Sequence, residues 1–225
     1  MTTDHSGPAE RRREWLRRAR LYLVCEARPG GRDPEEVLRP ALQAGVDVVQ
    51  LREKHGDERD IVRAGRSFRR LCDAYDALFI VNDRPELAIA CAADGVHVGQ
   101  DDQAVTEVRR MVGEDALIGL STHSEQQVDA VAGVDYFCVG PVYSTPTKPD
   151  YRPVGLDLVR YASRRADVPF FAIGGIDATN VGAVVQAGAE RVAVVRAIRD
   201  ARDPGSAAGA LRRGIEAGLH AGARG

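Results

Sequence analysis

The stretch Ala44-Gly45-Val46-Asp47-Val48-Val49-Gln50-Leu51 links the predicted end of a helix to the start of a strand. Glycine at a helix end readily takes the left-handed conformation that stops the helix, and the β-branched run after it is typical of a buried strand. The pattern recurs at Ala132-Gly133-Val134-Asp135 and Ala187-Gly188-Ala189-Glu190, and more loosely at Ala93-Asp94-Gly95. These copies precede the second, fourth, sixth and eighth predicted strands, so the chain carries a weak repeat of paired strand–helix units.

Eight short apolar runs predict eight strands, at residues 21–25, 46–51, 78–81, 95–98, 117–120, 136–139, 170–173 and 192–195. Stretches with helical spacing separate them, and such alternation indicates a parallel sheet. An open doubly wound sheet is the alternative, but no Gly-rich dinucleotide fingerprint follows the first run. Eight nearly regular units in 225 residues favour closure into a single-domain α/β fold, the (β/α)₈ TIM barrel.

Helix starts are marked by capping residues between the strands. Asp33-Pro34-Glu35-Glu36 combines an N-cap with proline at the first helical position, and Ser124 with Gln127 forms a second capping box. We expect the barrel to span residues 20–217, with a basic N-terminal extension at 1–19 and a flexible C-terminal tail at 218–225.

Composition excludes several classes of protein. A net charge of −2 argues against a general nucleic-acid or membrane-surface binder, and no apolar run approaches the length of a membrane span. The arginine-rich N-terminus lacks the apolar stretch of a secretory signal, so a cytoplasmic protein with a solvated helical lead-in is expected. The four cysteines show neither metal-ligand spacing nor a disulfide pattern.

Lysine is rare in this chain. Of 31 basic residues only Lys54 and Lys148 are lysines, and a compact ammonium offers donors that the planar guanidinium does not reproduce. Lys54 follows the second strand in Gln50-Leu51-Arg52-Glu53-Lys54, where alternation places Gln50, Arg52 and Lys54 on one face. Two cations and an amide suit a polyanionic ligand, although Schiff-base chemistry at Lys54 remains an alternative.

Two carboxylates follow the next two strands. Asp83 lies in Asn82-Asp83-Arg84, and Asp102 (or Asp101) ends the segment 97–102, which also holds His97 and Gln100. Each aspartate alone is typical of a helix N-cap. Together at neighbouring strand ends, and with cations nearby, they favour a Mg²⁺ site.

The remaining strand ends predict sites for phosphate. Ser121 ends the fifth strand, and the proline-stiffened loop at 140–149 carries Thr145, Thr147 and Lys148, which we interpret as an anion clamp and lid. Gly174 and Gly175 follow the seventh strand, and Val195 and Arg196 close the eighth. Backbone amides at these two loops commonly bind a phosphate monoester in this fold.

This set of strand-end motifs closely resembles the thiamine phosphate synthase family, in order, from about residue 20 to 215. The resemblance implies a Mg²⁺-dependent transferase of thiamine biosynthesis that joins hydroxymethylpyrimidine diphosphate to thiazole phosphate. It places the diphosphate against Arg52, Lys54, Lys148 and an ion held by Asp83 and Asp102. It assigns the pyrimidine to Gln50, Asn82 and Ser121, and the thiazole phosphate to Thr145, Thr147, Gly175 and the amides of Val195 and Arg196.

One departure from the family concerns Arg196, because serine often stands there; its side chain either plays no part or reaches the thiazole phosphate. His97 and His123 are expected beside the substrates with structural hydrogen bonds rather than proton-transfer roles. Three alternatives stay open: a thiazole tautomerase, a Schiff-base aldolase at Lys54, and a non-catalytic phosphate-ligand-binding barrel. The expected partners are small molecules, with association into a homo-oligomer left open.

Overall fold

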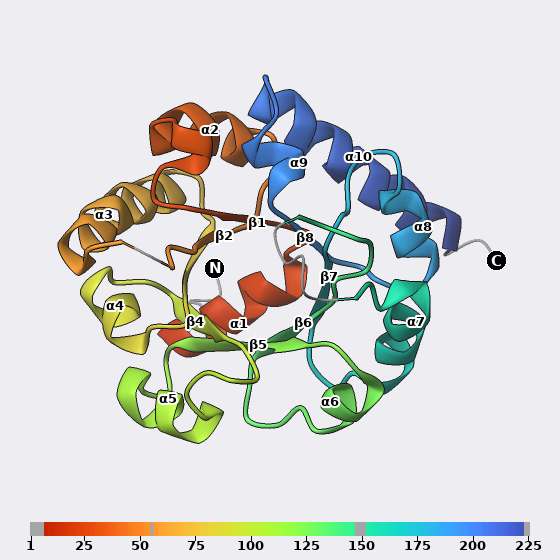
Figure 1. Cartoon of the computed structure of the whole chain (residues 1–225), viewed down its shortest axis with the longest axis horizontal. Helices are drawn as coiled ribbons and strands as arrows, with labels where there is room; N and C mark the ends of the chain where they lie inside the picture. Colours follow the sequence, from red (N-terminus) through yellow and green to blue (C-terminus); the bar gives the residue numbers. More distant parts are fainter. Residues whose placement is uncertain (1–6, 55, 147–151, 223–225) are drawn as a thin grey trace, which may run out of the picture.

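The computed structural model describes residues 7–54, 56–146 and 152–222. Eight strands form a closed barrel in the order β1 to β8, and each strand is parallel to both neighbours (Figure 1). The strands are β1 (Leu21–Cys25), β2 (Val48–Leu51), β3 (Leu78–Asn82), β4 (Gly95–Val98), β5 (Leu117–Thr122), β6 (Tyr136–Val139), β7 (Phe170–Ile173) and β8 (Val192–Val194). The predicted TIM barrel is thus confirmed.

The helices are α1 (Pro8–Arg18), α2 (Pro34–Gln43), α3 (Glu58–Ala74), α4 (Pro85–Ala90), α5 (Val105–Val112), α6 (Glu125–Asp129), α7 (Gly155–Arg165), α8 (Val181–Gln186), α9 (Arg196–Arg199) and α10 (Pro204–Gly222), with a 3₁₀ turn, η1 (Pro29–Gly31). Helices α2 to α10 surround the barrel, and α1 lies across one end of it (Figure 1). Both predicted caps are present: the Asp33 side chain accepts from the Glu35 amide, and that of Ser124 from the Gln127 amide.

Two apolar regions stabilise the molecule. The larger lies between the sheet and the surrounding helices, and the smaller fills the barrel interior with residues such as Val48, Leu117 and Phe171. Both faces of the strands are therefore buried, as expected of a parallel sheet covered by helices. The four cysteines are buried, free thiols.

The sequence repeat has a structural role at the amino-terminal end of the barrel. Gly45, Gly133 and Gly188 have positive φ, as predicted. The aspartates that follow bind backbone N–H groups at the starts of odd-numbered strands: Asp47 accepts from Leu21, and Asp135 from Ile118. These carboxylates satisfy donors that would otherwise be buried without a partner.

The looser copy was predicted wrongly in one respect. Gly95 is not a helix-ending glycine but the first residue of β4, and Ala92 takes the positive φ instead. A Cβ on Gly95 would lie 2.2 Å from the carbonyl oxygen of Leu117. Glycine is needed here because β5 approaches closely. Asp94 keeps the role of the repeat and accepts from the Phe79 amide.

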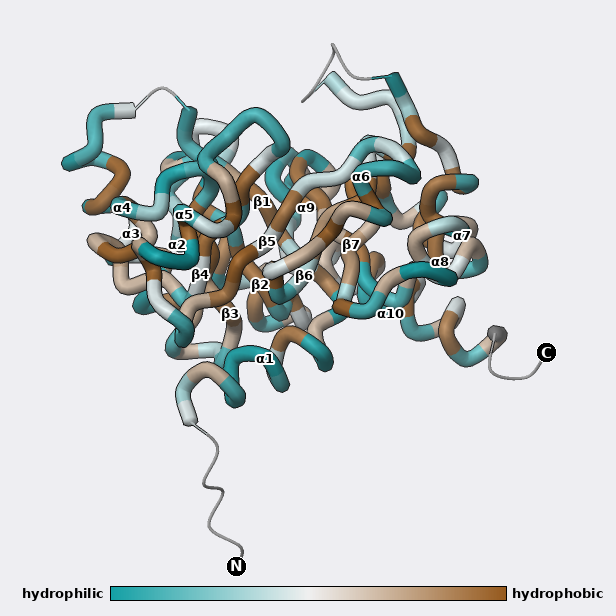
Figure 2. Tube along the Cα trace, turned by 90° about the horizontal axis from the view of Figure 1, so that it is seen from below, coloured by the Kyte–Doolittle hydropathy of each residue, from teal (hydrophilic) through white to brown (hydrophobic). Residues whose placement is uncertain are grey.

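Helix α1 lies under the amino-terminal end of the barrel, and the loops that follow the strands lie at the opposite end (Figure 2). Leu16 is buried with the barrel interior, Arg12 pairs with Asp94, and Arg13 pairs with Asp135. The segment expected as a solvated helix is helical, and Arg11, Arg17 and Arg18 are exposed. It is not solvated throughout, because Arg12 and Arg13 bind acids of the repeat and Leu16 packs against the barrel interior.

Alanine at Asp135 is expected to destabilise the fold by about 3–5 kcal/mol, since it leaves two partly buried guanidinium groups and a backbone amide without their carboxylate partner. Asp135 binds Arg13, Arg109 and the Ile118 amide, and its side chain is 7% exposed. Asp129 is the matched control, because it also pairs with an arginine but is 40% exposed. Urea unfolding should show a much smaller loss of stability for Asp129→Ala than for Asp135→Ala; equal losses would contradict this account.

The C-terminal end of the chain differs from the prediction. Helix α10 continues to Gly222, so the described part of the segment expected to be a tail from residue 218 is helical.

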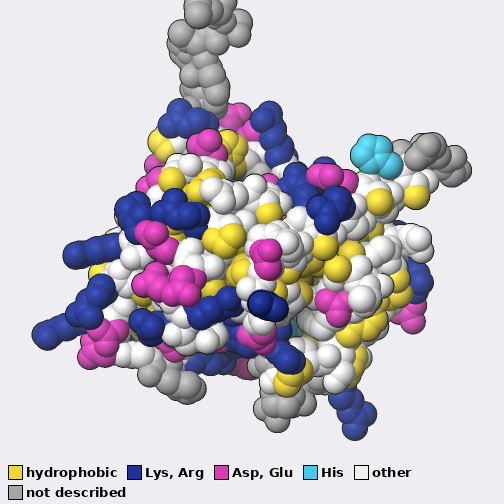
Figure 3. Space-filling view, turned by 90° about the horizontal axis from the view of Figure 1, so that it is seen from above, with side chains coloured by type: hydrophobic (Ala, Val, Ile, Leu, Met, Phe, Trp, Pro, Cys, Tyr) yellow, Lys and Arg dark blue, Asp and Glu magenta, His cyan; other side chains and the backbone are white. Residues whose placement is uncertain are grey.

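No helix in the described ranges is both long and apolar enough to cross a membrane. The face in Figure 3 intersperses arginines with aspartates and glutamates and shows no continuous patch of one sign.

Candidate active site at the carboxyl end of the barrel

A cavity of about 450 Å³ opens among the strand ends, where the active sites of this fold lie. It brings together ten of the residues predicted from the sequence: Gln50, Arg52, Asn82, His97, Ser121, Thr145, Gly174, Gly175, Val195 and Arg196. It also adds residues that the sequence did not single out, chiefly Tyr22, Glu26, Asp177 and Asp200.

The floor of the cavity is a continuous chain of hydrogen bonds across the barrel interior. The Gln50 Nε2 amide donates to the Tyr22 hydroxyl (2.7 Å), and the hydroxyls of Tyr22 and Tyr136 are 2.9 Å apart. His97 Nδ1 lies 3.3 Å from the Tyr136 hydroxyl, and its Nε2 lies 3.0 Å from Ser121 Oγ. Gln50 and Ser121, both predicted to contact the pyrimidine, are thereby connected.

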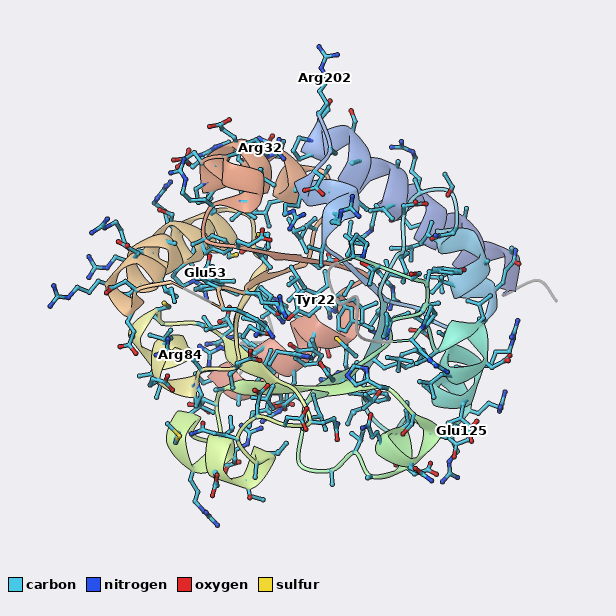
Figure 4. The ribbon with its side chains drawn as sticks, viewed as in Figure 1. Tyr22, Arg32, Glu53, Arg84, Glu125 and Arg202 are labelled. Atoms are coloured by element: carbon cyan, nitrogen blue, oxygen red, sulfur yellow. The ribbon has the colours of Figure 1, made fainter. Side chains whose placement is uncertain are left out.

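Burial determines the protonation of this floor. It raises the pKa of both tyrosines well above the ordinary value, since the phenolate would lose its hydration. Both rings therefore remain neutral donors and acceptors. Tyr22 lies at the centre of the ring of strands in Figure 4, and the Phe171 ring packs edge-on against it at 5.1 Å between centroids.

Asp83 and Asp102 come together beside the cavity. Burial and then the adjacent Asp102 carboxyl, which shares a hydrogen bond with it, raise the pKa of Asp83 to about 6, while Arg52 and Lys54 oppose the shift. Two carboxylates in contact either share a proton or bind a cation. Both Asp101 and Asp102 are exposed, but it is Asp102 that shares a hydrogen bond with Asp83, so Asp102 is the residue that pairs with Asp83.

This carboxylate pair fits a divalent ion with few protein ligands. Within the described ranges, no third His, Cys, Asp or Glu completes a cluster around it. Mg²⁺ commonly binds through one or two carboxylates and takes its other ligands from water and substrate phosphate. Asp83 has φ of 61° and its amide donates to the His97 carbonyl at 2.8 Å, so the backbone holds the carboxyl in position.

The predicted cations are divided between the cavity and its margin. Arg52 lines the cavity, whereas Lys54 is exposed beyond the end of β2 and is not among the lining residues. Both lie close enough to Asp83 to lower the pKa of its carboxyl. Gln100 also lies outside the lining set, and its side-chain amide binds the Ser121 carbonyl. Thr147 and Lys148 lie outside the described residues.

The loop after β6 packs directly on the glycines after β7. The amides of Val142 and Tyr143 donate to the carbonyls of Ile173 and Gly174 at 2.8 and 2.9 Å. Gly174 has φ of 103°, and a Cβ there would lie 2.5 Å from Pro141 Cα. The two glycines therefore let the loop that carries Thr145 lie against the cavity; whether their amides bind phosphate stays a prediction.

Arg196 and His123 have defined partners. The Arg196 Nε donates to Asp200 Oδ2 at 3.0 Å, and the Arg196 side chain is 51% exposed. His123 Nδ1 contacts the Gly140 carbonyl oxygen, and its amide donates to Gln127. These contacts give His123 a structural role in joining β5 to the start of the next loop.

Comparison with known proteins identifies the family. The family model described as thiamine monophosphate synthase matches residues 21–198, which include every strand-end motif. The chain belongs to the thiamine monophosphate synthase family. Its relatives include the thiamine-phosphate synthase of Acidothermus cellulolyticus, 51% identical over 194 residues that cover 84% of this chain and 92% of that protein.

The thiamine-phosphate synthase of Saccharopolyspora erythraea is 47% identical over 207 residues, which cover 88% of this chain and 93% of that protein. Among solved structures, thiamine phosphate pyrophosphorylase from Pyrococcus furiosus superposes with a TM-score of 0.83 at 32% identity. The superposition covers 92% of this chain and 98% of that one.

Proposed function

We propose that this chain is a thiamine phosphate synthase that joins 4-amino-2-methyl-5-hydroxymethylpyrimidine diphosphate to thiazole phosphate and releases diphosphate. The observation that supports it most is a cavity that combines a polar floor with the loops that bind phosphate in this fold, and that has the Asp83–Asp102 pair beside it. The relatives carry this activity in their names. Such a site accommodates two phosphorylated substrates side by side.

Each part of the cavity receives one part of the substrates. The pyrimidine lies on the floor against Gln50, Asn82 and Ser121. The thiazole phosphate lies at the opposite side, at the loops after β7 and β8, with Thr145 above it. The diphosphate lies at the edge near β2 and β3 and contacts the residues predicted for it: Arg52, Lys54 and Lys148, with an ion on Asp83 and Asp102.

The reaction needs little acid–base chemistry from the protein. The bond between the methylene carbon and the diphosphate oxygen breaks, and its electron pair leaves with the diphosphate. The 4-amino group of the ring stabilises the resulting carbocation, and the thiazole nitrogen lone pair then forms the new carbon–nitrogen bond. A Mg²⁺ ion would neutralise part of the charge on the departing diphosphate. Arg52 and Lys54 stabilise the same negative charge electrostatically.

Positioning and exclusion of water complete the mechanism. Holding the thiazole phosphate beside the cation replaces a bimolecular encounter, which contributes roughly 7–11 kcal/mol in the best models. Water would otherwise capture the cation as an alcohol. The loop after β6, which packs on Gly174, is the segment we assign to covering the cavity.

Formation of thiamine monophosphate from the two substrates, followed by thiochrome fluorescence, tests this function. We expect product with Mg²⁺, none with EDTA, and a large loss in Lys148→Ala. A thiazole tautomerase would bind thiazole phosphate without using diphosphate, and a Schiff-base aldolase would be trapped at Lys54 by borohydride. Ligand binding without turnover would favour the binding barrel. A cytoplasmic location and association into a homo-oligomer stay predictions from the sequence.

Arg196→Ala is expected to leave the KM for thiazole phosphate within about threefold of the wild type. The guanidinium already pairs with Asp200 and is half exposed, and the contribution of such a pair is small. The phosphate then relies on the backbone amide, which alanine retains. Steady-state kinetics with varied thiazole phosphate check this, and a rise above tenfold would instead assign the phosphate to the side chain.

A further inference from the structure

The hydrogen-bonded floor is more than a way to satisfy buried polar groups. It connects five strands, because Tyr22, Gln50, His97, Ser121 and Tyr136 come from β1, β2, β4, β5 and β6. Its two ends, Gln50 and Ser121, line the cavity, as do Tyr22 and His97. A change in the direction of the hydrogen bonds at one end therefore reaches the other.

Proton counting gives the chain a direction. Gln50 Nε2 donates to the Tyr22 oxygen, and either hydroxyl can be the donor between Tyr22 and Tyr136; the direction that leads away from Gln50 takes Tyr22 as the donor. The Tyr136 proton then passes to His97 Nδ1, which must be unprotonated to accept it. Both ring contacts of His97 depend on its tautomer; in this direction His97 carries its proton on Nε2 and donates to Ser121 Oγ. The Ser121 hydroxyl proton is left to point at a ligand.

The packing holds this arrangement in place. The Tyr22 and Tyr136 rings are fully buried and both contact Phe171, at centroid distances of 5.1 and 5.7 Å. At Gly119 an added Cβ would lie 2.2 Å from Tyr136 Cζ and 2.4 Å from His97 Nδ1. The junction between these two rings thus occupies the space that a side chain on β5 would otherwise fill.

We propose that Tyr22 and Tyr136 are positioning residues that lock the Gln50 amide and the Ser121 hydroxyl in one orientation, and thereby select a 4-aminopyrimidine. With Nε2 held by Tyr22, Gln50 presents its second N–H and its Oε1 to the ligand. A ring nitrogen acceptor beside an amino donor matches this pattern. A 4-oxopyrimidine presents the reverse pattern, which only a flipped amide would match. This inference rests on the proposed function.

Tyr22→Phe is the direct test, with affinity measured by calorimetry for the 4-amino and 4-oxo pyrimidine diphosphates in the presence of Mg²⁺. The lock predicts that the wild type prefers the amino compound and that this ratio falls by about tenfold or more in the variant, since one orienting hydrogen bond to a buried amide is lost. Affinity for thiazole phosphate should stay within twofold. A general loss of stability would weaken all three ligands alike.

Two further variants sharpen the result. Tyr161→Phe, which removes a hydroxyl bound to Asp129 on the surface, should leave the ratio unchanged. Tyr136→Phe should also lower the ratio of the two affinities. The Tyr22→Phe/Tyr136→Phe double variant should lower this ratio no further than the stronger single substitution does, because substitutions within one hydrogen-bond network are not additive. An unchanged ratio in folded Tyr22→Phe would overturn the proposal.

The ligand-free protein gives an independent reading. Nitrogen-15 NMR of labelled histidines, with His97→Asn to assign the signal, should show His97 with its proton on Nε2. A proton on Nδ1 would reverse the direction of the hydrogen bonds from Gln50 to Ser121. It would contradict the proposed positioning role of Tyr22 and Tyr136, whatever reaction the protein catalyses. If the wild type forms no thiamine monophosphate and binds neither pyrimidine, the proposed function is wrong. The His97 tautomer would still determine the direction of the hydrogen bonds in the cavity floor.

Discussion

Asp83→Asn is expected to lower kcat/KM by about a hundredfold or more while raising the melting temperature of the metal-free protein. The loss follows because the ion contributes several kcal/mol of charge stabilisation to the departing diphosphate. The gain in stability follows because the substitution removes a carboxylate whose charged form is disfavoured by burial and then by the adjacent Asp102. Asparagine tolerates the positive φ of this position, so backbone strain does not oppose the gain.

The pH dependence of this variant has a defined sign. The pKa of Asp83 is raised to about 6, so protonation favours the folded metal-free protein, and wild-type stability is lost as pH rises through that value. Asp83→Asn should therefore raise the melting temperature by a few degrees at pH 8. This increase should disappear at acidic pH, near the ordinary pKa of an aspartate. The affinity of the wild type for Mg²⁺ should fall below about pH 6, because protons compete for the ligand.

Calorimetry of thermal unfolding and Mg²⁺ titration measure both effects. Asp101→Asn is the control, since this neighbouring aspartate is exposed and lies outside the pair; it should change neither melting temperature nor activity appreciably. Full activity in Asp83→Asn, or a lower melting temperature at pH 8 without metal, would contradict the assignment of the ion to Asp83 and Asp102.

Gly174→Ala is expected to lower kcat/KM by about a hundredfold and to raise the KM for thiazole phosphate. The added Cβ would lie 2.5 Å from Pro141 Cα at a backbone φ of 103°, so the loop after β6 must shift. A displacement of about 1 Å at a positioning segment is enough to cost on the order of a hundredfold in rate. Steady-state kinetics with each substrate varied in turn would measure the change.

Gly155→Ala separates strain from collision. Gly155 also has a positive φ, of 68°, but nothing lies within 4 Å of its added Cβ. Its substitution should reduce stability through the backbone alone and leave the KM for thiazole phosphate near the wild-type value. Equal kinetic losses in both variants would mean that backbone strain, not the contact between the two loops, controls the cavity.

The barrel and most of its site residues were predictable because two simple rules apply. Strand–helix alternation predicts the parallel sheet, and polar residues after each strand predict the site at the carboxyl end. Gln50, Asn82 and Ser121 follow from these rules and do line the cavity. Gly95 shows their limit, because a glycine before a strand signals either a helix end or a close backbone approach.

The floor of the site was not predictable from sequence patterns. Every residue of β1 and β6 is buried, so no alternation of apolar and polar residues shows which side chains face the barrel interior. Tyr22 and Tyr136 consequently resembled ordinary apolar core. Their hydroxyls require partners when buried, and only the closed barrel brings these partners, from strands distant in sequence, together. The role of α1 was hidden for the same reason, since Arg12 and Arg13 bind acids far along the chain.

The stoichiometry of the wild-type reaction tests the central claim most directly. With both substrates and Mg²⁺, thiamine monophosphate and diphosphate should be measured in parallel by thiochrome fluorescence and a coupled diphosphate assay. The account predicts one diphosphate for each thiamine monophosphate, and neither product after chelation of the metal. Diphosphate released without thiamine monophosphate, or no product from folded protein that still binds thiazole phosphate, would contradict it.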